Sequence, residues 1–113
     1  MSAFFYGKSL KDHQYHFRLR NNNSQTILSS AEGYKTEQAC LNGITAVKTI
    51  ATDDNNYHRL NGTNNRHYFT LWAPNYEPIG KSEGYSTAQS RDQGIENCKK
   101  EAPVAAIKKL GAF

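Results

Sequence analysis

The segment Ser82-Glu83-Gly84-Tyr85-Ser86-Thr87, followed by the pair Gly94-Ile95, decides the fold because it occurs twice. An earlier copy reads Ser30-Ala31-Glu32-Gly33-Tyr34-Lys35-Thr36 and is followed by Gly43-Ile44. Recurrence at a fixed period is the mark of a repeat architecture. The chain is therefore composed of two versions of one unit of about 50 residues.

A second pair of matching segments lies upstream of these copies. Phe17-x-Leu19, with Asn23 and Ile27, matches Phe69-x-Leu71, with Asn75 and Ile79. Phe69 follows Phe17 by 52 residues, whereas Glu83 follows Glu32 by 51, so Ala31 is an extra residue in the first copy. An insertion at the end of a strand predicts a bulge or a loosened turn.

Length and charge limit the organisation and the partners of the chain. A chain of 113 residues suits one domain, 1–113, made of repeats at 1–54 and 55–113 that share a core, because one half alone would bury too little surface. The net charge of +4 permits binding to polyanions without requiring it. No signal-peptide core and no apolar run of about 20 residues is present, so we expect a cytoplasmic protein without a membrane partner.

Hydrophobic periodicity predicts the elements of each copy. Alternation over 14–20 and 67–73 indicates half-buried strands, and further strands are expected at 4–10, 26–30, 57–61, 78–82 and 105–113. Apolar and small residues spaced by three or four indicate a helix over 36–50 and another after residue 86. The predicted shared core comprises Phe17, Leu19, Ile27, Ile44, Val47, Phe69, Leu71, Ile79, Ile95 and Cys98.

Gly43 and Gly94 occupy matching positions inside the two predicted helices. A glycine in a helix interior costs about 1 kcal/mol relative to alanine, so its recurrence requires a reason. We expect close packing of the helix at both positions.

The repeated pattern resembles the YegP-like family of small bacterial tandem-repeat proteins, classed as a domain of unknown function. The match covers nearly the whole chain. It implies an α+β fold in which two strand-strand-strand-helix-strand units share one antiparallel sheet, with both helices on one face, a pseudo-two-fold axis and exchanged C-terminal strands. It also implies a monomer that acts as a pseudo-dimer. The family usually has Asn-Gly at the hairpin turns, where this chain has Asn23-Ser24 and Asn75-Tyr76.

The sequence does not nominate a catalytic residue, a metal ligand or a cofactor. Glu32 and Glu83 precede the repeated Gly-Tyr, and a carboxylate is favoured at such a helix start without any catalytic role. The histidines lack metal-ligand spacing, and no nucleophile or phosphate-loop motif is present. An enzyme or small-molecule site at the junction of the repeats, formed by Glu32, Glu83 and the tyrosines, is therefore the less favoured hypothesis.

One predicted sheet face carries basic and aromatic side chains. Its outward residues are His16, Arg18 and Arg20 in the first copy and Tyr68, Thr70 and Trp72 in the second. Basic and aromatic residues on one sheet face are what single-stranded nucleic-acid binders use. We favour a non-enzymatic binding or interaction module, with nucleic acid or protein as the partner, and an ordinary solvated face remains the simpler interpretation of this surface.

Overall fold

The computed structural model describes residues 2–113, and its elements follow the two copies along the chain. Each copy supplies three strands and a helix, and the second copy adds one further strand. The elements are β1 (Ala3–Lys8), β2 (Tyr15–Arg20), β3 (Thr26–Ser30), α1 (Glu37–Ile50), the 3-10 turn η1 (Asp54–Asn56), β4 (Tyr57–Asn61), β5 (His67–Trp72), β6 (Pro78–Lys81), α2 (Ala88–Glu101), the 3-10 turn η2 (Ala102–Val104) and β7 (Ala106–Lys109).

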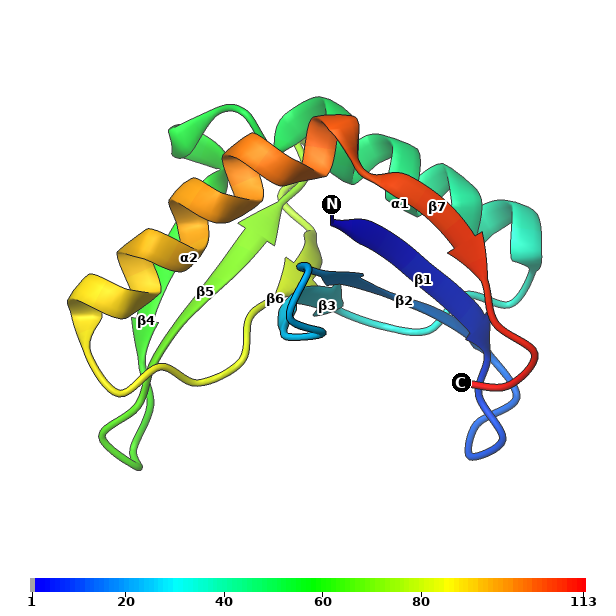
Figure 1. The fold of residues 1–113 in the computed structure, drawn as a ribbon, viewed down its shortest axis with the longest axis horizontal. Coiled ribbons are helices and arrows are strands. Elements are labelled where there is room, and N and C mark those ends of the chain that lie inside the picture. Colours follow the sequence, from blue (N-terminus) through cyan, green and yellow to red (C-terminus); the bar gives the residue numbers. More distant parts are fainter. Residues whose placement is uncertain (1) are drawn as a thin grey trace.

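The strands form one sheet in the order β4-β5-β6-β3-β2-β1-β7. Neighbouring strands are antiparallel except β1 and β7, which are parallel and pair Ala3 with Ala106. This one pair differs from the all-antiparallel expectation. The reason is that α2 ends near the start of β1, so β7 begins there and runs in the same direction (Figure 1).

Each helix is followed by a strand on the other half of the sheet. The helix α1 packs on β1 and β2, yet the chain after it pairs with β5 as β4. The helix α2 packs on β5, and the chain after it pairs with β1 as β7. The predicted exchange of strands is therefore confirmed. Ser29 and Lys81, which hold the same position in the two copies, pair with each other, as expected where an approximate two-fold axis crosses the sheet.

Both helices cover the same face of the sheet (Figure 1). Residues directly opposite each other in a sheet point to the same side. Leu71 is opposite Gly80, and Gly80 is opposite Ser30. The Ser30 hydroxyl accepts a hydrogen bond from the N–H of Phe17, so one continuous face runs from β5 to β2. The predicted α+β class, with two helices on one face, is confirmed.

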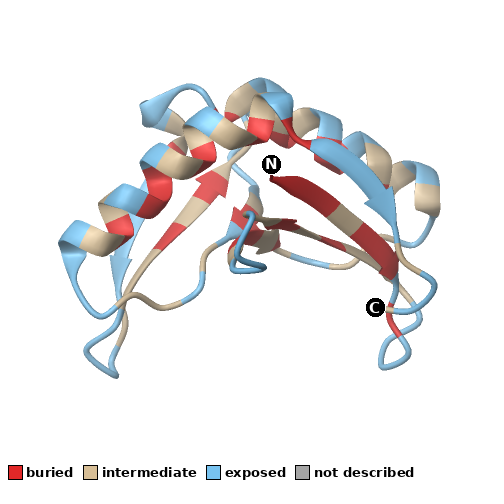
Figure 2. Cartoon of the chain, viewed as in Figure 1, coloured by how far each residue is buried: buried red, intermediate tan, exposed pale blue. Residues whose placement is uncertain are grey.

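A single core joins the two copies. The predicted core residues are buried except Ile79, which is half-buried and packs against the cluster. Figure 2 shows the buried parts of strands and helices turned toward one another. Cys40 and Cys98 are free and fully buried, and burial raises the pKa of both thiols to about 11. The thiols are therefore neutral and act as small apolar side chains.

The repeated tyrosine of each copy lies against the repeated helical glycine. A methyl group at Gly43 would lie 2.8 Å from Cζ of Tyr34, and one at Gly94 would lie 2.8 Å from Cζ of Tyr85. Each tyrosine ring also stacks on the strand phenylalanine of its own copy, at 6.1 Å for Phe17 and 6.4 Å for Phe69. The glycines are therefore required because no side chain fits between ring and helix.

We expect Gly43→Ala and Gly94→Ala each to destabilise the protein by about 1–3 kcal/mol, because the added methyl overpacks a tight contact. Helix propensity alone predicts the opposite, a gain of about 1 kcal/mol. Chemical denaturation measures the difference. Gly111→Ala is the control, since nothing lies within 4 Å of a methyl group there. A higher denaturation midpoint for either helical variant would contradict the close contact.

The β2–β3 and β5–β6 hairpins turn through three residues rather than two. Asn21 N–H donates to Gln25 O at 3.0 Å, and Ala73 N–H donates to Glu77 O at 2.9 Å. The last loop residue has a positive φ in both hairpins, 61° for Ser24 and 63° for Tyr76. Three-residue hairpin loops commonly place their final residue in this left-handed region. Both hairpins lack Asn-Gly, and both have a three-residue loop in place of the two-residue turn that Asn-Gly favours.

Replacing Tyr76 by glycine should stabilise the protein by about 0.5–1 kcal/mol, because a left-handed backbone costs a non-glycine residue about 1–2 kcal/mol. Tyr76 is 86% exposed, so its removal sacrifices little packing. Thermal or urea unfolding tests this. The neighbouring Asn75→Gly should destabilise, because the Asn75 side chain accepts from Glu77 N–H and its φ is not positive. Equal effects of the two substitutions would refute the argument.

Candidate functional site

The face of the sheet opposite the helices, called here the open face, presents a row of residues that crosses all seven strands. Register defines this row: each residue is directly opposite the next, and opposite residues share a face. From edge to edge it runs His58, Thr70, Lys81, Ser29, Arg18, Phe5 and Lys108. Thr70 and Ser29 separate the ring and the cations of the first five positions, and Phe5 then lies between the two cations Arg18 and Lys108.

The six predicted site residues lie on the open face in two groups. His16, Arg18 and Arg20 are on β2, and Tyr68, Thr70 and Trp72 are on β5. Because β3 and β6 separate these strands, the groups stand three strand spacings apart, about 14 Å. The structure therefore brings the residues onto one surface but not into one pocket.

Cations and aromatic rings are in contact in the β2 group. The Arg18 guanidinium lies 4.4 Å from the ring centroid of Phe113, and His16 stacks on the same ring at 6.1 Å. Arg20 and Lys108 both lie over Phe5, at 5.7 and 5.9 Å. Such contacts hold a cation in place without neutralising it.

The β5 group is built around the one tryptophan of the chain. Trp72 packs on His58 with ring centroids 4.8 Å apart. Its indole N–H donates to Thr70 Oγ1 at 2.8 Å, which fixes the ring orientation. The Tyr68 hydroxyl accepts from Asn64 Nδ2 at 3.1 Å, and a methyl group added at Gly84 would lie 3.1 Å from the Tyr68 ring. Both large rings are half-buried, so each retains accessible surface.

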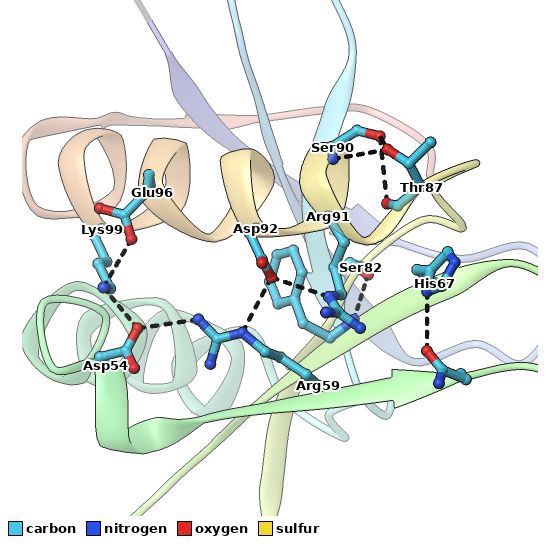
Figure 3. Close-up of polar contacts among 12 residues, drawn as sticks. Asp54, Arg59, His67, Ser82, Thr87, Ser90, Arg91, Asp92, Glu96 and Lys99 are labelled. Atoms are coloured by element: carbon cyan, nitrogen blue, oxygen red, sulfur yellow. Dashed lines mark hydrogen bonds and ion pairs between the residues drawn. The ribbon is translucent and has the colours of Figure 1, made fainter.

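Carboxylates neutralise several cations on the helix-bearing side. Figure 3 shows Arg59 between Asp54 and Asp92, with Nη2 3.3 Å from Asp54 Oδ1 and Nε 3.1 Å from Asp92 Oδ1. Lys99 lies 2.7 Å from Asp54, and its hydrogen bond is the main cause of the lowered pKa of that carboxyl. Lys109 pairs with Glu37 at 3.2 Å.

His16 of the open face lies 2.9 Å from Asp12, but the four Arg and Lys side chains of this face are not neutralised in this way. Within residues 2–113, no carboxylate lies within 4.0 Å of the charged groups of Arg18, Arg20, Lys81 or Lys108. In addition, Nε of Arg20 is buried without a hydrogen-bond partner. Glu83 borders two shallow hollows on this face and is the carboxylate that accompanies Lys81 there. The open face therefore carries a local excess of positive charge.

Sequence reasoning missed Phe5, Lys81, Lys108 and Phe113. Phe5 stands in a run of aromatic residues whose alternation is not visible from polarity, because the buried Phe4 and Tyr6 flank it. The repeat could have located Lys81, since it matches Ser29 of the first copy. Phe113 lies in the predicted strand 105–113, but β7 ends at Lys109, and the position of Phe113 follows from the backbone hydrogen bond of its N–H to Lys8 O at 3.2 Å.

On the helix-bearing side, a groove of about 820 Å³ lies between the copies. The first copy contributes Asn21, Gln25, Thr26 and Ile27, and the second contributes residues of the segment 83–97. Glu83 and Tyr85 line this groove, whereas Glu32 and Tyr34 are not among its lining residues. The paired carboxylates of the junction hypothesis are therefore not brought together in this groove.

Metal-binding clusters and membrane-spanning helices are both absent from the described residues. Between residues 2 and 113, no group of three or more His, Cys, Asp or Glu side chains is arranged to hold a metal ion. In the same range, none of the helices is both long and apolar enough to span a bilayer.

Comparison with known proteins identifies the repeats. The family described as "Domain of unknown function (DUF1508)" matches twice, at residues 11–57 and 63–108. A "UPF0339 protein in ptx operon 5'region" of Stutzerimonas stutzeri is 41% identical over 98% of this chain and 99% of its own. The "UPF0339 protein YegP" of Escherichia coli K12 is 33% identical over 96% of this chain and 97% of its own.

Solved structures agree with this assignment. The solution NMR structure of yegP from E. coli, a protein described as of unknown function, superposes with a TM-score of 0.89 at 34% identity and covers 97% of this chain and 93% of that one. A UPF0339 protein of Shewanella oneidensis gives a TM-score of 0.89 at 32% identity, with coverage of 97% and 92%. The chain therefore belongs to the DUF1508 family, as a tandem-repeat member of the YegP-like UPF0339 proteins, whose function is unknown.

Proposed function

We propose that this protein is a non-enzymatic binding module whose open face binds single-stranded nucleic acid. One observation carries the proposal: Arg18, Arg20 and Lys108 of the open face lie over aromatic rings and have no carboxylate partner, whereas Arg59, Lys99 and Lys109 on the other side are paired with carboxylates. Phosphates would be attracted to the free cations, and unstacked bases would stack on the rings.

The spacing of the two groups supports a linear ligand. About 14 Å separates the β2 group from the β5 group, and Lys81 lies between them. A single strand that crosses the sheet would place its bases on the rings at either end while its phosphates pass Lys81 and Arg18. A duplex offers no unstacked bases to these rings, so we expect it to bind more weakly.

Two other uses of the molecule have less support. A protein partner for the open face would require a complementary acidic surface, and the present contacts do not select one. A catalytic site at the junction would require a second group to act with Glu83, and Glu32 does not line the groove.

The first test is the salt dependence of binding to a mixed-sequence single-stranded oligonucleotide. Each neutralised phosphate contributes a log–log slope of about −0.7, so the four open-face cations should give a slope of about −2 to −3. Removing two of them with Arg18→Ala and Arg20→Ala should reduce its magnitude by about 1.4. Lys109→Ala removes a paired charge from the other side and should leave the slope unchanged.

The second measurement separates stacking from charge. Trp72→Ala should weaken binding by about 1–3 kcal/mol, roughly 5- to 150-fold, without altering the salt slope. Trp72→Phe keeps a ring and should retain most of the affinity. In the unmodified protein, stacking should quench the single tryptophan. Absence of quenching at low salt and high oligonucleotide concentration would end the nucleic-acid proposal.

A further inference from the structure

The two repeats differ at one residue near the groove between the copies. In the first copy the extra residue Ala31 donates its N–H to the carbonyl of Ile79 at 3.1 Å. In the second copy Glu83 follows Ser82 as Ala31 follows Ser30, but among the described residues its N–H makes no such bond to the carbonyl of Ile27, which matches Ile79. Ile27 is also the bulged residue opposite Leu19 and Arg20, and it lines the groove. One wall therefore offers a backbone acceptor outside the sheet ladder.

The opposite wall is a line of amide side chains on α2. Gln89, Gln93 and Asn97 follow one another at intervals of four residues, which places them about 6 Å apart along the helix. Gln93 donates Nε2–H to Asn97 Oδ1 at 3.1 Å. Because an amide carries two N–H donors and an acceptor oxygen, each member of this pair keeps further hydrogen-bonding capacity toward the groove.

The two copies have also diverged along this wall. Ser90 and Asn97 of α2 correspond to Ala39 and Ala46 of α1, which keep the same helix with no polar side chain. The second helix has thus the more polar surface at the position where the groove lies. The Ser90 hydroxyl donates to the carbonyl of the cap residue Thr87, which accounts for Ser90 at the helix start. Alanine is a stronger helix former than asparagine, so helix stability does not account for Asn97.

Charge distinguishes the groove from the open face. Lysine and arginine are absent from its lining residues in the described chain, and Glu83 is the charged side chain among them. A polyanion would therefore be repelled here. The site instead suits a polar ligand that carries a single positive group.

We propose that the groove binds a short extended polypeptide with one basic side chain beside Glu83. An extended chain repeats every two residues, about 6.7 Å, which is close to the spacing of the amides on α2. Its backbone N–H groups supply donors for the Ile27 carbonyl, which lies beyond the short pairing of β3 with β6. The volume of about 820 Å³ lies within the range of ligand sites. A neutral saccharide would use the amides but would gain nothing from the Glu83 charge.

The probe is an acetylated, amidated heptapeptide of alternating valine and threonine with a central lysine, titrated into the isotope-labelled full chain by NMR. Backbone shifts should be confined to Ile27, Glu83 and the exposed side of α2. The same peptide with a central glutamate should bind at least about tenfold more weakly, a difference of about 1.4 kcal/mol. Glu83→Gln should abolish that preference.

The chain provides matched variants. Ser90→Ala with Asn97→Ala gives α2 the residues of α1 and should weaken peptide binding by about tenfold, the effect of losing two hydrogen bonds. Gln38→Ala with Asn42→Ala makes a comparable change on α1 and should have no effect. Arg18→Ala with Arg20→Ala should not alter peptide binding, so this test and that of the open face fail independently.

Three outcomes would overturn the proposal. The first is the absence of shifts at millimolar peptide, and the second is equal binding of the lysine and glutamate peptides. The third is a neutral trisaccharide that reproduces the groove shifts while the peptides do not, which would assign the groove to a carbohydrate.

Discussion

The contact between a tyrosine ring and a helical glycine, made once in each copy, is the constraint on which the rest of the structure depends. Tyr34 and Tyr85 leave the strand-to-helix turn, stack on a strand phenylalanine and press against Gly43 and Gly94. A ring held between sheet and helix sets the distance between the two layers. Because both copies use the same contact, both helices rest at the same height on the same face, and the other face is left uncovered.

That division of the sheet into a covered and an uncovered face also divides the charge. On the helix side, Arg59 and Lys99 form ion pairs with carboxylates of neighbouring elements. These pairs stabilise the charged carboxylates and so lower the pKa of Asp54 and Asp92. The open face has no second layer that could supply carboxylates to Arg18 and Arg20. Its positive charge is therefore a consequence of the architecture as much as of the composition.

The repeat made most of the fold predictable, because every local pattern could be checked against its second copy. The strands and the helix of each copy and the shared core followed from it, and the exchanged strands were implied by the family resemblance. The direction of β7 did not, since it depends on where α2 ends relative to β1. The contact of Phe113 with Arg18 was equally inaccessible, because Phe113 lies beyond the end of β7, where strand alternation assigns no face. The insertion of Ala31 was visible in the sequence. Its structural effect was not, because that effect depends on the hydrogen bond from Ala31 N–H to the carbonyl of Ile79.

The parallel pair of β1 and β7 has a consequence for synthesis of the chain. Ala3 pairs with Ala106, so the backbone groups along one edge of β1 stay unpaired until β7 is synthesised, about a hundred residues later. At bacterial or eukaryotic rates of about 5–20 residues per second, this delay is about 5–20 s. During that time the aromatic strand Phe4-Phe5-Tyr6 has an unsatisfied edge, which is the kind of segment that pairs with other chains. Newly made copies emerging close together on one messenger RNA are therefore the setting in which this fold is most exposed to misassembly.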